Sequence, residues 1–233
     1  MFLTPCKLSF MSLHPPKPHI ILGVTGSVAA VKTAELCSSL LSLGEVRVIA
    51  TDASKRFLKE TLIPTSALPL LGDHDEWQSW KEVGDEVLHI ELRRWADILV
   101  LAPLSANTLA KVSTGLCDNL LTCVLRAWDY QSGAPLVVAP AMNTMMWSHP
   151  LTAEQLEALQ SFGAGVPGTV TVVPPVSKKL ACGDVGVGAM APVTEIVKAV
   201  EVALQALRLR RHRDMEGTEL GEVQAAAAAA APY

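Results

Sequence analysis

A histidine with two arginines nearby is the first group of residues in this sequence that could carry chemistry. His89 begins the string His-Ile-Glu-Leu-Arg-Arg-Trp, whose arginines are Arg93 and Arg94. An imidazole can move a proton near neutral pH, and a guanidinium can hold an anion through paired hydrogen bonds. Together these groups could transfer a proton on an anionic substrate that an arginine holds. A structural histidine and ion pairs of the arginines with Glu91 or Asp97 would fit the same string.

An asparagine and a cysteine in turn-like segments are further candidates. Asn143 follows the string Pro-Ala-Met, where its amide could hold a carboxylate or cap the helix that follows. Met145 would belong either to the core or to an apolar wall for a planar ligand. Cys182 is followed by the glycines Gly183, Gly186 and Gly188, and glycine hinges around one thiol are typical of a mobile lid.

Small and polar residues follow several of the predicted strands. Gly26 and Ser27 come after the first strand, where a close backbone approach and free N–H groups suit a phosphate. The same turn needs glycine for its geometry alone, so the signal is open to both interpretations. Hydroxyl and amide groups after later strands could cap helices or hold a second part of the same ligand. These groups belong to Thr51, Ser105, Asn107 and Thr108.

The elements that must position these residues alternate between two patterns. Apolar, β-branched runs over 19–24, 46–51, 98–102, 136–139 and 170–173 predict buried strands. Helical spacing covers 27–43, 105–116, 119–128, 152–162 and 193–209. This alternation predicts an α/β fold with a Rossmann-like, doubly wound parallel sheet, in which ligands bind beyond the carboxyl ends of the strands.

Composition limits the classes of function. Of 233 residues, half are apolar and 18% are charged, which predicts one large core spanning 18–209. A flexible arm is expected over 1–17 and a low-complexity, alanine-rich tail over 210–233. The net charge of −4 argues against a nucleic-acid partner. No run is long and apolar enough for a membrane span, and five cysteines without a CxxC pair predict neither disulfides nor a metal site. A reduced, cytoplasmic protein is expected.

Several strings together identify a family. They are Gly-Ser-Val-Ala-Ala, Leu-His-Ile-Glu-Leu-Arg-Arg-Trp-Ala-Asp, Ala-Pro-Leu-Ser-Ala-Asn-Thr-Leu, Pro-Ala-Met-Asn-Thr and Ala-Cys-Gly-Asp. In this combination and order the chain resembles the homo-oligomeric flavin-containing cysteine decarboxylases over residues 18–209. Within that family it is most similar to the members that act on 4′-phosphopantothenoylcysteine.

The resemblance implies a flavodoxin-like flavoprotein that assembles as a homotrimer and binds FMN between subunits. It implies that His89 and Cys182 are catalytic, and that Asn143, Met145 and Arg94 bind substrate. Phe57 would contact the flavin ring. The residues implied to hold FMN are Gly26, Ser27, Thr51, Phe57, Ser105, Asn107 and Thr108.

The implied reaction removes CO₂ from 4′-phosphopantothenoylcysteine during coenzyme A biosynthesis and leaves 4′-phosphopantetheine. A thioaldehyde supplies the electron sink that a simple carboxylate lacks, and an ene-thiolate follows. Two other readings stay open: a relative that decarboxylates peptides ending in cysteine, and a regulatory subunit of the same fold that inhibits a protein phosphatase. The complete set of His89, Asn143 and Cys182 favours an enzyme.

Overall fold

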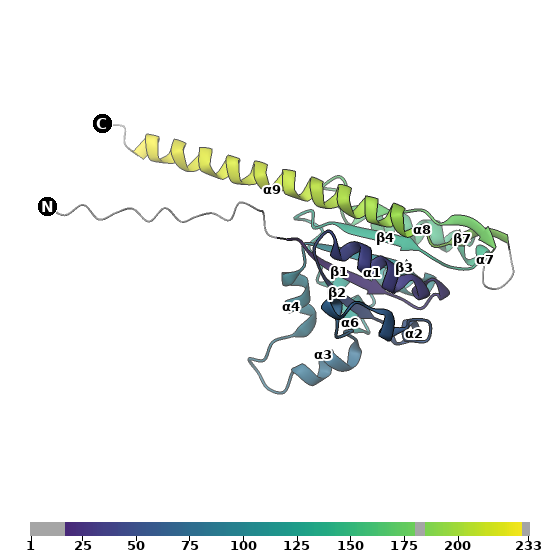
Figure 1. The fold of residues 1–233 in the computed structure, drawn as a ribbon. Helices are drawn as coiled ribbons and strands as arrows, with labels where there is room; N and C mark the ends of the chain where they lie inside the picture. The colour runs from purple at the N-terminus through teal and green to yellow at the C-terminus, as the bar shows by residue number, and fades with distance from the viewer. Residues whose placement is uncertain (1–16, 180–184, 230–233) are drawn as a thin grey trace.

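The computed structural model describes residues 17–179 and 185–229. Its strands alternate with helices along the chain, as the sequence predicts (Figure 1). The strands are β1 (His19–Val24), β2 (Glu45–Ala50), β3 (Ile98–Leu104), β4 (Leu136–Pro140), β5 (Val170–Val172), β6 (Val176–Lys179) and β7 (Val185–Ala189).

Helices connect these strands. The 3₁₀ turns are η1 (Val28–Lys32), η2 (Glu60–Leu62) and η3 (Thr65–Ala67). The α-helices before β4 are α1 (Thr33–Leu41), α2 (Asp52–Lys55), α3 (Asp73–Ser79), α4 (Leu88–Trp95), α5 (Ala106–Thr114) and α6 (Leu120–Arg126). Those after it are α7 (Thr144–Trp147), α8 (Pro150–Ser161) and α9 (Val193–Ala229).

The main sheet is parallel and has the strand order β2-β1-β3-β4-β5. This is the flavodoxin-like doubly wound order, whose direction reverses between β1 and β3. In register, Ile20 of β1 lies between Val46 of β2 and Ile98 of β3. The predicted fold class is confirmed, and the reversal point lies where Gly26, Ser27 and Ser105 leave their strands.

Each strand buries both of its faces, which explains its continuous apolar run. Ile20, Leu22 and Val24 contribute to one core with α1 and α9, whereas Ile21 contributes to a second core with α5, α6 and α8. Alternate residues of a strand point to opposite faces, so a sheet covered by helices on both sides needs apolar residues at every position.

The sequence did not indicate several elements. The sequence suggests a loosely organised segment over residues 163–179, yet its last four residues form β6, which pairs antiparallel with β7. The helix predicted over 193–209 continues to Ala229, and only its last five residues belong to the alanine run, where helix propensity is highest. The expected tail therefore continues α9. Except for Lys17, the predicted N-terminal arm lies outside the described residues.

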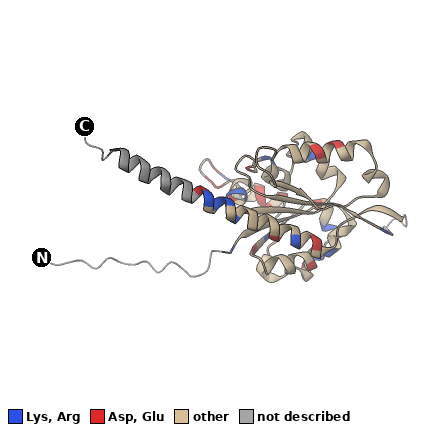
Figure 2. Cartoon of the chain, turned by 90° about the horizontal axis from the view of Figure 1, so that it is seen from above, with Lys and Arg blue, Asp and Glu red and all other residues tan. Residues whose placement is uncertain are grey.

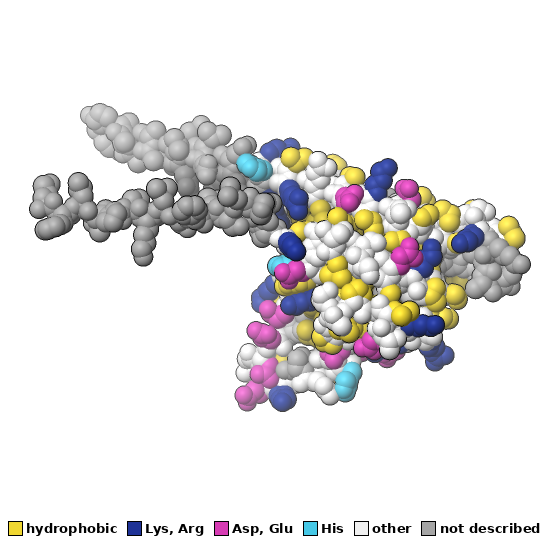
Figure 3. Space-filling view, in the orientation of Figure 1, with side chains coloured by type: hydrophobic (Ala, Val, Ile, Leu, Met, Phe, Trp, Pro, Cys, Tyr) yellow, Lys and Arg dark blue, Asp and Glu magenta, His cyan; other side chains and the backbone are white. Residues whose placement is uncertain are grey.

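Charged side chains are distributed unevenly over the surface. Basic residues of α9 gather where this helix leaves the body (Figure 2), and two of them bond to it. Arg211 pairs with Asp97 at 2.7 Å, and Arg210 donates to the Gly133 carbonyl. Acidic side chains gather over the α3–α4 connection at the lower left of Figure 3. In the part of the chain that the structure describes, no helix has the length and apolar character needed to cross a membrane.

Candidate active site

The turn after β1 brings a glycine and a helix start to the carboxyl edge of the sheet. A Cβ on Gly26 would lie 2.7 Å from the Cβ of Ala53, so only glycine lets this turn pack against α2. Ser27 caps η1, and its Oγ accepts a hydrogen bond from the Ala29 amide at 3.4 Å. The turn therefore has the compact geometry that the sequence predicted.

A buried hydroxyl joins this turn to the one after β3. Thr25 donates to the Pro103 carbonyl at 2.7 Å, and its Oγ1 accepts from the Ser105 amide at 2.8 Å. Ser105 caps α5 by accepting from the Thr108 amide, and its hydroxyl lies 3.2 Å from the Thr108 hydroxyl. The predicted ligands Ser27, Ser105 and Thr108 are thus brought to one edge across the point where the strand order reverses.

The remaining predicted FMN ligands lie on the neighbouring turns. Thr51 is buried at the start of α2, where its hydroxyl donates to the Val24 carbonyl at 3.3 Å. Asn107, in the first turn of α5, has an exposed side chain. Phe57 follows α2 and is 37% exposed, which leaves part of its ring available to a planar partner.

The turn after β4 places Asn143 beside β7. Asn143 caps α7, as its capping interpretation predicted, with Oδ1 accepting from the Met145 amide at 2.8 Å. The Met142 amide donates to the Gly188 carbonyl at 2.9 Å, so β7 packs directly on this turn. The Thr144 hydroxyl oxygen is buried and has no hydrogen-bond partner within residues 17–179 and 185–229.

Met145 and Met146 do not belong to the core. Their side chains are 75% and 49% exposed, whereas Met142 is buried. Met145 is therefore not a core residue, and its role in an apolar wall for a planar ligand stays a prediction.

His89 lies in the first turn of α4 and pairs with a buried acid. Its Nδ1 is 2.5 Å from Oε1 of Glu76 on α3, and the Glu76 side chain is only 10% exposed. The Sγ of Cys123 on α6 is near both, since the ligand-type atoms of the three residues lie within 4.8 Å of one another. A metal with ~2.0 Å bonds at tetrahedral angles would hold its ligands ~3.3 Å apart. The shorter N–O separation is that of a hydrogen bond.

The two arginines of α4 have different partners. Arg94 pairs with Glu91 at 2.8 Å and is 65% exposed, so a substrate anion can compete for it. Arg93 donates to the Ala127 carbonyl and pairs with Asp129 at 3.2 Å. Its role in this chain is to hold α4 against the end of α6.

The predicted site residues form two groups within one chain. α7, with Asn143 at its start, lies at the opposite end of the molecule from α4, which carries His89 (Figure 1). Cys182 lies outside the described residues, between β6 and β7. Within a single chain, the predicted flavin ligands and Asn143 therefore lie at the same edge of the sheet, whereas His89 lies away from them.

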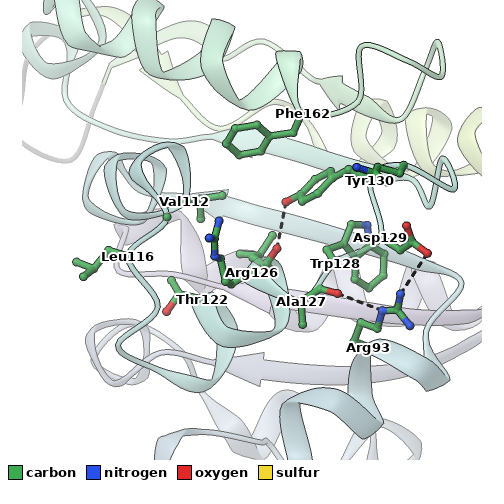
Figure 4. A pocket seen from close by; sticks show the side chains of 13 residues that line it. Arg93, Val112, Leu116, Thr122, Arg126, Ala127, Trp128, Asp129, Tyr130 and Phe162 are labelled. Atoms are coloured by element: carbon green, nitrogen blue, oxygen red, sulfur yellow. Dashed lines mark hydrogen bonds and ion pairs between the residues drawn. The ribbon is translucent and has the colours of Figure 1, made fainter.

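Two pockets of the described chain are lined by none of the predicted site residues. One pocket of about 450 Å³ is lined by Arg93, Arg126, Tyr130 and Phe162 (Figure 4). Two of its polar side chains bond within the chain: the Tyr130 hydroxyl donates to the Leu125 carbonyl, and Arg93 pairs with Asp129. Burial raises the pKa of the Tyr130 phenol. A second pocket, of about 750 Å³, lies beside Arg47 and Trp95.

Sequence reasoning missed three residues near these groups. Glu76 carries no sequence signal, because it lies thirteen positions before His89 in a short helix without strong periodicity. Thr25 directly precedes the string Gly-Ser-Val-Ala-Ala, and Thr144 is the last residue of Pro-Ala-Met-Asn-Thr. Each of these two threonines lies just after the carboxyl end of a strand, where ligands bind in such sheets, and this position could have identified both as candidates.

Comparisons with known proteins agree with this geometry. The model of the family described as Flavoprotein matches residues 10–205. The chain belongs to the Flavoprotein family. Two similar proteins are the phosphopantothenoylcysteine decarboxylases of rice and mouse. The rice protein is 54% identical over 82% of both chains. The mouse protein is 50% identical over 86% of this chain and 93% of its own.

Solved structures give the same result. A phosphopantothenoylcysteine decarboxylase with a cysteine-to-serine substitution, complexed with pantothenoylaminoethenethiol, has a TM-score of 0.76 and 50% identity, covering 81% of this chain and 99% of its own. A structure described as an FMN binding protein has a TM-score of 0.73 and 50% identity, covering 82% and 98%. The predicted resemblance, the enzyme class of carboxy-lyase and FMN as the cofactor are confirmed.

The residues at the carboxyl edge fit FMN. Hydroxyl groups of Ser27, Ser105 and Thr108 stand at helix starts, where N–H groups favour a phosphate. The exposed Phe57 and Met145 side chains offer apolar surface for a flavin ring. The Thr144 hydroxyl, which has no hydrogen-bond partner among the described residues, offers a polar contact.

Proposed function

We propose that this chain catalyses the FMN-dependent decarboxylation of 4′-phosphopantothenoylcysteine to 4′-phosphopantetheine in coenzyme A biosynthesis. The observation that carries the proposal is the gathering of Ser27, Ser105, Thr108 and Asn143 at one edge of the sheet, in a chain about half identical to decarboxylases of that substrate. This edge combines a phosphate-type cradle with an amide suited to a carboxylate. A cytoplasmic location fits the same pathway.

The residues of the chain have separate tasks in this reaction. When bound, FMN supplies a two-electron acceptor that oxidises the substrate thiol to a thioaldehyde and later returns the electrons. His89 takes the thiol proton during the oxidation. Asn143 donates hydrogen bonds from its NH₂ group to the carboxylate, and Met145 shields it from water. After CO₂ leaves, Cys182 protonates the ene-thiolate. Because the two electrons removed in the oxidation are then returned, the overall reaction is redox neutral.

We also propose that the working enzyme is a homotrimer in which His89 of one protomer faces the cradle of another. The separation of α4 and α7 in one chain supports this arrangement. Trp77 and Val83, near the Glu76–His89 pair in sequence, are 77% and 94% exposed, and exposed large apolar side chains are typical of interfaces.

A hybrid experiment tests the shared site. His89→Asn and Asn143→Asp chains, each inactive alone, are co-expressed in equal amounts and the mixed oligomer is purified by two different tags. If each site takes His89 and Asn143 from different protomers, about a third of the sites in the purified mixed trimers are intact and activity returns to about that level. Hybrids as inactive as either parent would contradict the shared site.

A substrate comparison tests the reaction itself. The FMN-loaded protein is given 4′-phosphopantothenoylcysteine, its dephosphorylated form and a peptide that ends in cysteine. We expect kcat/KM to be highest for the phosphorylated substrate, because Arg94 and its neighbours hold an anion. Equal or higher turnover of the peptide would assign the chain to the peptide-specific branch instead.

A further inference from the structure

The buried carboxylate of Glu76 lies against His89 in a geometry that a general base requires. Oε1 of Glu76 is 2.5 Å from Nδ1 of His89, and the two side chains are 10% and 25% exposed. A carboxylate has only acceptor sites, so the proton in this bond belongs to the imidazole Nδ1. The lone pair of the neutral ring is then on Nε2, the nitrogen that can accept a proton.

The helix that carries Glu76 is itself fixed by carboxylates. The Asp75 carboxylate accepts from the Gly72 amide at 2.7 Å and closes the start of α3. Asp73 accepts from the Leu120 amide at 2.8 Å and ties α3 to the start of α6. Glu76 is therefore held in place by its helix before it bonds to His89, which limits the rotation of the imidazole.

The third residue of this cluster does not compete for the bond. Burial, with a further contribution from the Glu76 charge, raises the pKa of the Cys123 thiol to about 11. This thiol is neutral at physiological pH and contacts the Cys117 carbonyl at 3.6 Å. The carboxylate that faces the imidazole is then that of Glu76.

We propose that Glu76 is a positioning residue for the reaction: it fixes His89 as the Nδ1–H tautomer and orients Nε2 to take the thiol proton of the substrate. This role rests on the proposed function of His89. A carboxylate that only stabilised the fold would need neither the Nδ1 atom nor the tautomer, whereas a general base needs both.

Steady-state kinetics of three FMN-loaded variants test the role. In Glu76→Gln the amide lacks the charge and can present its NH₂ to Nδ1, so we expect kcat to fall by about 10–100-fold with KM changed less than about threefold. Glu76→Asp keeps the charge at a longer reach and should recover part of the loss. Glu82→Gln, an exposed glutamate on the α3–α4 connection, is the matched control and should match wild type.

A spectroscopic measurement on the wild type does not depend on the variants folding. ¹⁵N-histidine NMR, with the His89 signals assigned by their loss in His89→Asn, reports which ring nitrogen carries the proton. We expect the Nδ1–H form in the wild type. An Nε2–H form would overturn the proposal, and so would Glu76→Gln with full FMN content and unchanged kcat.

Two outcomes distinguish the positioning role of Glu76 from a metal site and from a failure of the proposed role of His89. If Cys123→Ser loses as much activity as Glu76→Gln and Zn²⁺ restores it, the three residues are a metal ligand set and the proposal is wrong. If His89→Asn keeps full activity, the proposed function of His89 fails; if only Glu76→Gln keeps it, the failure is confined to Glu76.

Discussion

Gly188 allows β7 to lie against the turn that carries Asn143. A Cβ at this position would be 2.3 Å from the Met142 carbonyl oxygen, and the φ angle of Gly188 is +152°. The clash is with the backbone, which cannot move aside as a side chain can. The Met142 amide also donates to the Gly188 carbonyl at 2.9 Å, so any shift of β7 breaks a hydrogen bond.

We predict that Gly188→Ala lowers the free energy of unfolding by about 2–4 kcal/mol. Positive φ costs a residue with a Cβ ~1–2 kcal/mol, and overpacking adds ~1–3 kcal/mol. The lower entropy of the unfolded chain returns ~0.4–1 kcal/mol. Because β6 and β7 flank the segment that contains Cys182, we also expect kcat to fall while FMN content is kept.

Substitutions at two other glycines separate the cost of a positive φ from the cost of the steric clash. Gly168 has φ of +79° and no atom within 4 Å of its would-be Cβ, so Gly168→Ala should cost only about 1 kcal/mol. Gly165 has the same open space without positive φ, and Gly165→Ala should be neutral or slightly stabilising. Urea unfolding followed by circular dichroism measures all three. A cost for Gly188→Ala equal to that of Gly168→Ala would refute the steric reasoning.

Three further outcomes are expected. Ser105→Ala removes the cap of α5 and should cost ~1 kcal/mol in urea unfolding and weaken FMN binding in a fluorescence titration, whereas Ser113→Ala on the same helix should do neither. Thr25→Val takes the hydroxyl partner from the buried Ser105 amide, while the Pro103 carbonyl keeps its bond from the Thr25 backbone amide, and should cost ~1–3 kcal/mol by the same assay. Burial raises the pKa of both the Cys37 and the Cys123 thiol to about 11, so their thiolate fraction at pH 8 is ~10⁻³. The rate of their alkylation by iodoacetamide, measured by mass spectrometry, should therefore rise about tenfold from pH 8 to pH 9. A rate that does not depend on pH would contradict the burial of these thiols.

The sheet could be predicted from the sequence because each buried strand is marked by an apolar run within its own few residues. Strands buried on both faces need unbroken apolar runs, and β1, β3 and β4 begin at the residues where those runs begin. The caps at Ser105 and Asn143 were predictable for the same reason, since a cap joins residues two or three positions apart.

The elements that sequence reasoning missed depend on distant contacts. The β6–β7 pair has no apolar run, since β6 contains two lysines and β7 two glycines, and it packs on the turn of Met142 and Thr144 some forty positions earlier. Glu76 reaches His89 only because α3 packs on α4. The division of the predicted site between α4 and α7 is likewise a property of the folded chain, and no spacing in the sequence indicates it.

The central claim is that this chain decarboxylates 4′-phosphopantothenoylcysteine with FMN. The most direct test measures the CO₂ released per chain by the FMN-loaded wild type, with His89→Asn as the control. We predict many turnovers without an added electron acceptor, one 4′-phosphopantetheine for each CO₂, and loss of both in His89→Asn. An FMN-loaded protein that releases no CO₂ would contradict the account and would favour the regulatory role of the same fold.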